Sequence, residues 1–312
     1  MTSAAVTHVR ELPKLIAEIE RYLAQHFPYM ARVIQKRIDD FGDNWLTDFE
    51  SELEIFFPNL ISLNAASQGY GEFALDALRM QKRFDKSGKY ETPSYDELLL
   101  SVYGNEQYMF DLYLPGILLS QFLWPHHYRQ LKFFRDSFLS VIEKGKSTSF
   151  ADVGVGTGFY SKEMLKALPL AKGIGVDISE HSLAHTVELL GKFGLQNRYE
   201  TQLRDLREMP NNIVDYVVSV EVLEHLEDPT DFLKNLYRIL ENGGRGYITA
   251  AINAPNADHI YLYKSLFEVE AQIRDAGFRI ADKAEFTAFI PTASESVPSG
   301  GVFIVYKEQG AK

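Results

Sequence analysis

Apolar residues recur every three or four positions along much of the chain before residue 143. This spacing gathers apolar side chains on one helix face, and it predicts helices over residues 12–27, 70–78 and 128–142. Pro125 suits the first turn of the last helix, where no backbone N–H is needed. Between the helices stand residues typical of turns or loops: Pro58, Gly69, Gly88, Pro93 and Gly104. The pattern indicates a helical N-terminal region.

The pattern changes after a polar stretch at residues 143–149. Short apolar runs then alternate with helical ones. Strands are expected near residues 148–153, 171–176, 198–203, 213–220, 244–251, 278–287 and 302–308. Helices are expected near residues 160–168, 181–191, 230–240 and 264–276. Such alternation predicts a parallel sheet, except that the last two strands have no helix between them and are expected to pair antiparallel.

The expected fold class is therefore α/β, with a doubly wound, seven-stranded, mostly parallel sheet and an N-terminal all-α region. With 312 residues, 46% of them hydrophobic, the chain can bury a sizeable core. We expect two domains, one helical over residues 1–143 and one α/β over residues 144–312.

Charge and cysteine content narrow the function. The formal net charge is −11, which disfavours nucleic acid as a partner because phosphates need basic residues. There is no cysteine, so disulfides, thiolate metal sites and a thiol nucleophile are excluded. Residues 1–14 lack an apolar signal core, and Asp111, Pro115 and Gln121 interrupt the most apolar run, so we expect a cytoplasmic protein without a membrane span. The oligomeric state stays open, a homo-oligomer included.

The strongest candidate site lies where the first two predicted strands end. The first strand carries Asp152 and runs into a turn that contains Gly154, Gly156 and Gly158; the second ends at Asp177. Glycines let the backbone approach a ligand closely, and a carboxylate after the second strand can accept hydrogen bonds from ribose hydroxyls. These residues predict a nucleoside-binding site.

The glycine spacing is G-x-G-x-G rather than the G-x-G-x-x-G of nicotinamide-cofactor proteins. With Asp152 before it, this turn resembles the first motif of the class I S-adenosylmethionine-dependent methyltransferases, which have a Rossmann-like fold. Further segments match that family's motifs in order: Asp177, residues 204–210, residues 215–229 and residues 240–244. The resemblance covers about residues 146–312. Arg204 departs from it, because the family usually has glycine before the third-strand acid.

The resemblance implies a binding site for the donor S-adenosylmethionine. Asp177 would bind the ribose, and Asp205 would lie near the adenine amino group. The resemblance extends the donor site to these residues: Asp152, Gly154, Gly156, Gly158, Asp177, Ile178, Asp205, Leu206 and Glu221. It also implies methyl transfer to a small-molecule acceptor. We favour an oxygen or an activated carbon as the atom that accepts the methyl group, and we expect a role in natural-product biosynthesis.

The segment Glu221-Val-Leu-Glu-His225 follows the fourth predicted strand. It resembles an E-x-x-E-H pattern found in ubiquinone-biosynthesis O-methyltransferases and in small-RNA 2′-O-methyltransferases. Two carboxylates and an imidazole suit Mg²⁺, Mn²⁺, Fe²⁺ or Zn²⁺, and His259 after the fifth strand could complete a metal site with Glu221, Glu224 and His225. Two alternatives remain: His225 as a metal-free base or polar contact, and a purely structural segment.

In the resembled family, helical additions usually cover the substrate cleft. Residues 122–128 precede the first strand, and His126, His127 or Tyr128 among them could contact the donor or the acceptor. Together with the two histidines of the possible metal site, this gives three catalytic candidates: His127, His225 and His259. The alternative is an ordinary amphipathic helix. A second aromatic cluster is more typical of core than of a pocket: Tyr103, Tyr108, Phe110 and Tyr113.

Three other functions stay open. A nitrogen acceptor would need less help from the protein than an oxygen. A regulatory module would bind the donor without turnover. A nicotinamide-dependent oxidoreductase is disfavoured by the glycine spacing.

Overall fold

The computed structural model describes residues 11–90, 94–289 and 297–309. Its N-terminal part is helical, as the periodicity predicts. The longer helices are α1 (Lys14–His26), α2 (Val33–Phe41), α3 (Asp43–Phe56), α4 (Leu60–Ser87), α7 (Leu114–Leu123) and α8 (Pro125–Phe133). Shorter elements are η1 (Pro28–Met30), α5 (Tyr95–Leu98), η2 (Leu99–Tyr103), α6 (Glu106–Tyr108), η3 (Met109–Tyr113), η4 (Phe134–Phe138) and η5 (Leu139–Val141).

Gly69, which the sequence suggested as a turn residue, lies instead inside the long helix α4. A β-carbon there would come within 2.6 Å of the backbone oxygen of Asp111, and one at Gly71 would meet the Phe27 ring at 2.3 Å. Both glycines therefore allow neighbouring segments to pack directly against the helix backbone. Gly88 does end the helix, in a left-handed conformation. Pro93 lies outside the described residues.

The sheet has seven strands in the order β3-β2-β1-β4-β5-β7-β6. Their bounds are β1 (Ser149–Val153), β2 (Lys172–Asp177), β3 (Tyr199–Leu203), β4 (Val214–Ser219), β5 (Leu240–Ile252), β6 (Arg279–Thr287) and β7 (Ser299–Tyr306). β1 to β5 pair in parallel, and β7 is antiparallel to both β5 and β6, which confirms the prediction for the last two strands. The connection between β6 and β7 includes residues 290–296, which lie outside the described residues.

Helices follow the strands, and the strands' alternating side chains divide the core into two layers. The helices are α9 (Phe159–Ala167), α10 (Glu180–Lys192), α11 (Pro229–Ile239) and α12 (Leu266–Asp275), with short turns at η6 (Gln196–Arg198), η7 (Leu206–Glu208) and η8 (Leu223–His225). One sheet face packs on α11 and α12. The other packs on α8 and α9, so that Tyr247 and Ile248 of β5, for example, face opposite layers. Parallel strands covered on both faces are the usual doubly wound arrangement.

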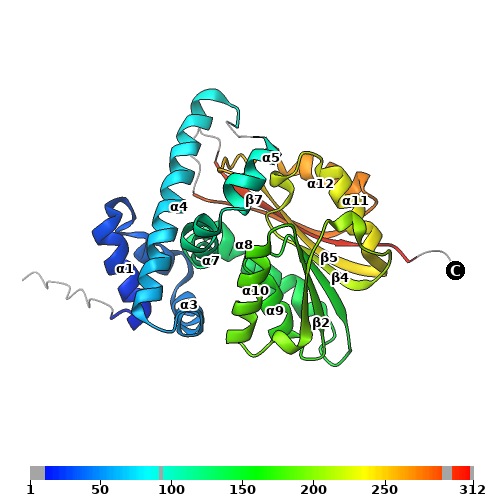
Figure 1. The fold of residues 1–312 in the computed structure, drawn as a ribbon, viewed down its shortest axis with the longest axis horizontal. Helices are drawn as coiled ribbons and strands as arrows, with labels where there is room; N and C mark the ends of the chain where they lie inside the picture. The colour runs from blue at the N-terminus through cyan, green and yellow to red at the C-terminus, as the bar shows by residue number, and fades with distance from the viewer. Residues whose placement is uncertain (1–10, 91–93, 290–296, 310–312) are drawn as a thin grey trace, which may run out of the picture.

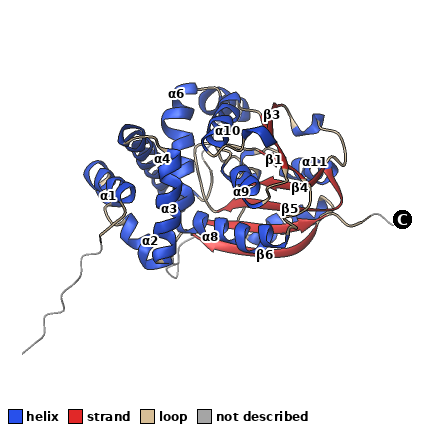
Figure 2. Cartoon of the chain, turned by 90° about the horizontal axis from the view of Figure 1, so that it is seen from below, coloured by secondary structure: helices blue, strands red, loops and turns tan. Residues whose placement is uncertain are grey.

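The helical region lies beside the sheet, with α1 on the side away from the strands and α3 next to α9 and α10 (Figures 1 and 2). One continuous apolar cluster joins the two regions, because it contains Phe49 and Phe122 from the helices and Phe150 and Phe159 from the α/β part. Among the described residues, no helix is long and apolar enough to cross a membrane.

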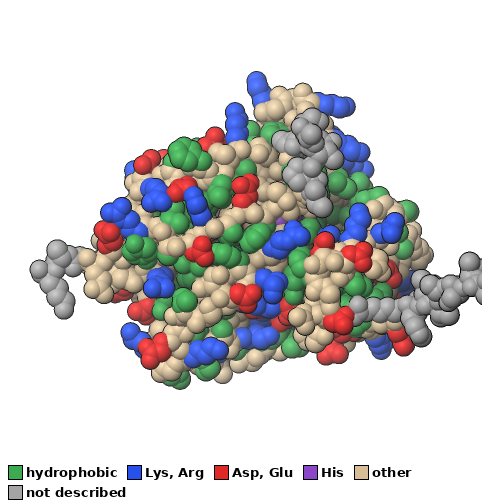
Figure 3. All heavy atoms as spheres, turned by 180° about the vertical axis from the view of Figure 1, so that it is seen from behind, with side chains coloured by type: hydrophobic (Ala, Val, Ile, Leu, Met, Phe, Trp, Pro, Cys, Tyr) green, Lys and Arg blue, Asp and Glu red, His purple; other side chains and the backbone are tan. Residues whose placement is uncertain are grey.

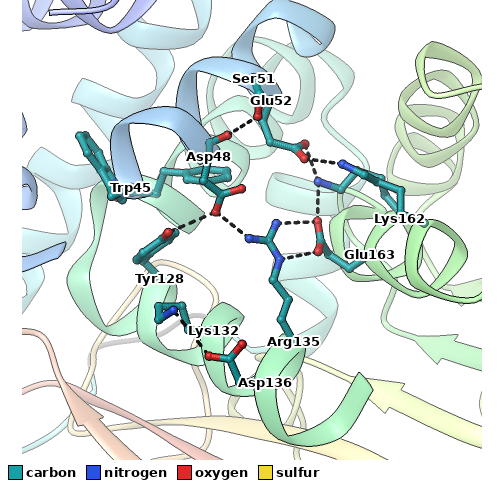
Figure 4. Close-up of polar contacts among 12 residues, drawn as sticks. Trp45, Asp48, Ser51, Glu52, Tyr128, Lys132, Arg135, Asp136, Lys162 and Glu163 are labelled. Atoms are coloured by element: carbon teal, nitrogen blue, oxygen red, sulfur yellow. Dashed lines mark hydrogen bonds and ion pairs between the residues drawn. The ribbon is translucent and has the colours of Figure 1, made fainter. Parts of the chain in front are cut away.

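A buried network of charges also joins the two regions (Figure 4). Lys162 of α9 has a fully buried side chain and lies 2.5 Å from Glu52 of α3. Arg135 bridges Asp48 and Glu163, at 2.6 Å from each. The predicted boundary between residues 143 and 144 lies between η5 and β1, and these contacts cross it.

Candidate active site

The glycine turn after β1 has the backbone conformation that glycine favours. Gly154, Gly156 and Gly158 have φ angles of +73°, +53° and +76°. The backbone N–H of Gly156 donates to Oδ2 of Asp177 at 3.1 Å, and that of Ser179 donates to Oδ1 at 2.9 Å. Burial raises the pKa of Asp177, while these backbone amides act in the opposite direction. The turn and the end of β2 thus form one rigid unit around a carboxylate.

Asp152 lies beside this unit and is buried. It accepts a hydrogen bond from the Ser161 hydroxyl of α9 at 2.6 Å. Burial raises the pKa of Asp152 to about 7, and the neighbouring Asp177 also raises it. Asp152 therefore carries only part of its negative charge near neutral pH.

Glu221 follows β4 and is held in an unusual conformation, with φ at +53°. Its carboxylate accepts hydrogen bonds from the Thr249 hydroxyl at 2.7 Å and from the Gln130 amide at 3.3 Å. Gln130 belongs to α8, so the helical region helps to position Glu221. No sequence signal had indicated Gln130.

A cavity of about 490 Å³ runs from these strand ends into the helical region. Of the predicted donor-site residues, six line it: Asp152, Gly154, Gly156, Asp177, Ile178 and Glu221. Open sheets of this kind bind ligands beyond the carboxyl ends of their strands, at the point where strand order reverses, which here is between β1 and β4.

The other three predicted donor-site residues do not line the cavity. Gly158 precedes α9 and packs on Thr186. Asp205 forms an exposed ion pair with Arg207 at 2.6 Å, and Leu206 is buried in the apolar layer beneath α11 and α12. Contacts of Asp205 and Leu206 with adenine stay a prediction.

The structure brings together Glu224, His225 and His259, whose ligand atoms lie within 4.8 Å of one another. The Nδ1 atom of His225 contacts the carbonyl of Asp258 at 2.9 Å, and that of His259 contacts the carbonyl of Ala254 at 2.5 Å. A carbonyl accepts only, so each Nδ1 carries hydrogen and each Nε2 is left with a lone pair. Glu221, the fourth predicted metal ligand, is not part of this group and is bound to Thr249 and Gln130 instead.

Glu224 is fully buried, and both of its carboxylate oxygens lack a hydrogen-bond partner among the described residues. Burial raises the pKa of Glu224 well above its usual value, and the nearby Glu221 adds to this. Burial lowers the pKa of His259 to about 4. Because burying an unpaired charge costs free energy, the carboxyl group and the imidazole are more stable uncharged when no cation is bound.

Asp258 is a functional residue that the sequence did not indicate. It is fully buried and accepts hydrogen bonds from the hydroxyls of Tyr113 at 2.5 Å and Tyr103 at 3.1 Å. Its Oδ2 lies 3.3 Å from Nδ1 of His225. As the sequence favoured, Tyr113 belongs to a buried apolar cluster, and Tyr103, Tyr108 and Phe110 pack against it. Tyr103 and Tyr113 also line the cavity. In the sequence, only His259, the neighbour of Asp258 and a predicted site residue, pointed to this position.

Residues 122–128 do reach the cavity, through Trp124, Pro125, His126 and His127. His127 contacts the Ser120 hydroxyl at 2.9 Å, and burial lowers its pKa to about 3. Tyr128 is absent from the lining and donates to Asp48 at 3.2 Å.

Comparison with known proteins agrees with this geometry. A family model described as a methyltransferase domain matches residues 151–248. Phosphoethanolamine N-methyltransferase 3 of Arabidopsis thaliana is 27% identical over 45% of this chain and 31% of its own length. A ubiquinone biosynthesis O-methyltransferase of Pseudomonas putida is 30% identical over 42% of this chain and 64% of its own length. The matches thus span less than two thirds of either relative.

Among solved structures, phosphoethanolamine N-methyltransferase 2 of Haemonchus contortus in complex with S-adenosyl-L-methionine has the same fold. The TM-score is 0.53 at 17% identity, over 70% of this chain and 60% of that one. The matched segment of the family model contains Asp152, the glycine turn, Asp177 and Glu221. On these grounds residues 151–248 match a methyltransferase domain, and the chain is similar in sequence to methyltransferases and in fold to one that binds S-adenosylmethionine.

Proposed function

We propose that the protein transfers a methyl group from S-adenosylmethionine to a small-molecule acceptor, at an oxygen or an activated carbon. The observation that carries this proposal is a single cavity that joins the glycine turn to the histidine cluster and the helical region. Asp177, which lines this cavity, would bind the ribose hydroxyls. Asp152 and Glu221 offer negative charge to the cationic donor.

The chemistry asks little of the protein beyond placement, because the sulfonium already activates the methyl group. The acceptor atom must lie in line with the bond between sulfur and methyl, and water must be excluded. Placement of this kind is worth on the order of 7–11 kcal/mol in the best intramolecular models. We assign residues 1–143 the role of a lid and substrate domain that encloses the acceptor.

An oxygen or carbon acceptor must lose a proton before or during attack. The Nε2 atoms of His225 and His259 are the candidate proton acceptors, because their Nδ1 atoms are bound to backbone carbonyls. His127, which also lines the cavity, is the third candidate. The two curated relatives bear the names of an N- and an O-methyltransferase, so nitrogen remains the alternative acceptor.

A divalent metal is a further part of the proposal, and the residues present fit one. Glu224 offers two buried oxygens without partners, and His225 and His259 each direct hydrogen at Nδ1 to a carbonyl, which orients the ring and leaves Nε2 for an ion. Glu224, His225 and His259 would hold Mg²⁺, Mn²⁺, Fe²⁺ or Zn²⁺. When bound, the ion would act as a Lewis acid toward an acceptor oxygen.

Removal of one ligand tests the metal. We expect Glu224→Gln to abolish Mn²⁺ binding in equilibrium dialysis, with affinity for S-adenosylhomocysteine unchanged, because an amide is a much weaker ligand than a carboxylate. The control is Glu227→Gln, since Glu227 is exposed and lies outside the group. A wild-type chain that binds no divalent ion and keeps full activity after chelation would refute the metal.

The activity itself is tested with labelled donor and a metabolite extract. We expect label in a small molecule with the wild-type chain and loss of S-adenosylhomocysteine binding in Asp177→Ala, because ribose hydrogen bonds disappear.

A thermal-shift comparison of S-adenosylhomocysteine with NAD(H) tests the oxidoreductase alternative, since only the ligand that binds raises the melting temperature. Donor binding without any labelled product would favour a regulatory module. A cytoplasmic location and a role in natural-product biosynthesis are also proposals.

A further inference from the structure

The cavity is electrically divided between its two ends. At the sheet end its lining carries the carboxyl groups of Asp152, Asp177 and Glu221. At the other end, in and next to α2, it carries Arg32, Lys36 and Arg37. No carboxylate of the described lining lies on α2. Because the chain as a whole is acidic, with a formal net charge of −11, this group of cationic side chains suggests a binding site for an anionic ligand.

Arg37 is the most buried of these cations, with 7% of its surface exposed. One guanidinium nitrogen pairs with Asp40 at 3.0 Å, and another lies 3.5 Å from the carbonyl of Leu123. Its Nε has no hydrogen-bond partner among the described residues. Leaving a buried donor of a charged group unsatisfied is costly, so a partner is expected here.

Two other lining residues near Arg37 also have a buried polar atom without a partner. They are Oε1 of Gln121 and Nδ1 of His126. Both belong to the junction of α7 and α8, whose Leu123 carbonyl faces Arg37. Gln121 can present its amide N–H₂ in place of Oε1 by rotation, and a neutral His126 can carry hydrogen at Nδ1. Because all three residues line the cavity, each can offer a donor to a group bound in it.

Between the two charged ends the cavity lining is mainly aromatic and apolar. Trp124 is stacked between Phe73, at 5.3 Å between ring centroids, and His126, at 5.5 Å. Ile117 and Tyr113 continue this wall toward Asp258 and the histidine cluster. Such a wall suits a flat, apolar molecular body.

We propose that the acceptor is a small apolar molecule with an anionic group, carboxylate or phosphate, which Arg37 binds with Gln121 and His126. This inference rests on the proposed methyl transfer and names the class of its acceptor. The anion would anchor one end of the molecule, and the apolar wall would direct its other end toward the donor and the histidine cluster. Charge-assisted hydrogen bonds to a buried arginine are among the strongest that a site can offer.

The charges around Arg37 leave room for an added anion. Asp40 neutralises part of the guanidinium charge, but its own side chain is 34% exposed. Burial lowers the pKa of Arg37, Asp40 acts in the opposite direction, and the nearby positive charge of Arg129 adds a smaller lowering effect. The rival ligand is the donor's own amino-acid carboxylate, which the experiment must separate from an acceptor anion.

Calorimetry on the full chain, saturated with S-adenosylhomocysteine, tests the proposal. The probes are benzoate, phenyl phosphate and the uncharged benzamide. We expect at least one anion to bind about tenfold more tightly than benzamide, about 1.4 kcal/mol at 25 °C. Whichever anion binds better then identifies the group as carboxylate or phosphate. Equal affinity for all three probes, or binding of none, overturns the proposal.

Variants then assign the preference to a residue. Arg37→Gln should remove the preference for an anion, Arg37→Lys should restore part of it, and the exposed Arg83→Gln control should leave it unchanged. Affinity for S-adenosylhomocysteine should stay the same in all three. If Arg37→Gln weakens that affinity instead, the anion is the donor's carboxylate and the proposal fails. A wild-type chain that does not bind S-adenosylhomocysteine would refute the methyl transfer itself, separately from the anion site.

Discussion

At the scale of single residues, the acid that opens the glycine motif makes a testable contribution to stability. The pKa of Asp152 is about 7 in the folded chain, mainly because of burial, against about 3.9 for an exposed aspartate. The folded state therefore binds a proton more tightly than the unfolded state. The resulting stabilisation is complete below about pH 4 and disappears as pH rises to about 7.

We therefore expect Asp152→Asn, which imitates the protonated acid, to lose this pH dependence. Relative to wild type, the variant should gain about 4 kcal/mol in free energy of unfolding between pH 4 and pH 8, at roughly 1.36 kcal/mol per pKa unit. Urea unfolding of both chains at several pH values measures the difference. A difference that stays constant with pH would show that Asp152 is ionised throughout.

The predicted residues that line the cavity are those whose sequence signal is local. Gly154 and Gly156 need positive φ angles, and Asp177 ends a strand, so each position is visible in its own segment. Asp258 and Gln130 were missed for the opposite reason. Asp258 stands out only through its hydrogen bond with Tyr103, and Gln130 only through its hydrogen bond with Glu221. The two residues of each pair are far apart in the chain.

At the scale of elements, a buried ion pair docks α3 against α9. Lys162 is fully buried between Glu52 and Glu163, as Figure 4 shows. Removing the only partner of a buried charge costs about 3–5 kcal/mol, but here Lys162 also pairs with Glu163 and Glu52 also pairs with Lys166. We therefore expect Lys162→Met and Glu52→Gln each to lower the free energy of unfolding by about 1–3 kcal/mol, and the double variant to lose clearly less than the sum. Urea unfolding measures all three.

An exposed pair provides the control for this cycle. Arg79 and Asp76 lie on α4 with side chains 62% and 47% exposed, and such surface pairs contribute about 0–1 kcal/mol. Asp76→Asn should therefore leave stability almost unchanged. If the losses of Lys162→Met and Glu52→Gln simply add, the two side chains are energetically independent and the pair does not dock the helices.

Helices and strands were predictable where apolar spacing is regular and undisturbed. The predicted strands and α9 to α12 lie within a few residues of their observed bounds, because alternation and helical period are properties of each segment alone. The helical region was predicted less completely, because α2, α3 and α7 were not predicted and α4 was predicted only over residues 70–78 but is observed over Leu60–Ser87. A glycine such as Gly69 suggests a turn in the sequence. In the structure, Gly69 and Gly71 lie inside the helix because segments from elsewhere in the chain occupy the space that a β-carbon would fill.

At the scale of the whole molecule, the face drawn in Figure 3 carries charges of both signs. On the face that Figure 3 shows, basic and acidic side chains alternate without a broad basic area. This agrees with a formal net charge of −11 and with a small-molecule acceptor, because binding of nucleic acid relies on basic surfaces. The cationic residues of the proposed anion site line the cavity.

The two predicted domains share one core, and this has a consequence for truncation. The apolar cluster beneath α8 and α9 combines Phe49, Phe56 and Phe122 of the helical region with Phe150 and Phe159 of the α/β part. A fragment of residues 144–312 would expose Phe150 and Phe159 to water, and it would leave Lys162 without Glu52. Burial of one such side chain contributes about 1.5–3 kcal/mol, so loss of several is comparable with the stability of a whole domain, about 5–15 kcal/mol.

We therefore expect the fragment of residues 144–312 to aggregate or to unfold without a cooperative transition, whereas the whole chain unfolds in one. Urea unfolding followed by circular dichroism and by tyrosine fluorescence should give coincident curves for the whole chain, since a shared core links both regions. A soluble fragment that unfolds cooperatively and binds S-adenosylhomocysteine would contradict this expectation. The helical region would then be a separate lid placed on an independent methyltransferase domain, and the charged network at Lys162 would be an interface between two domains.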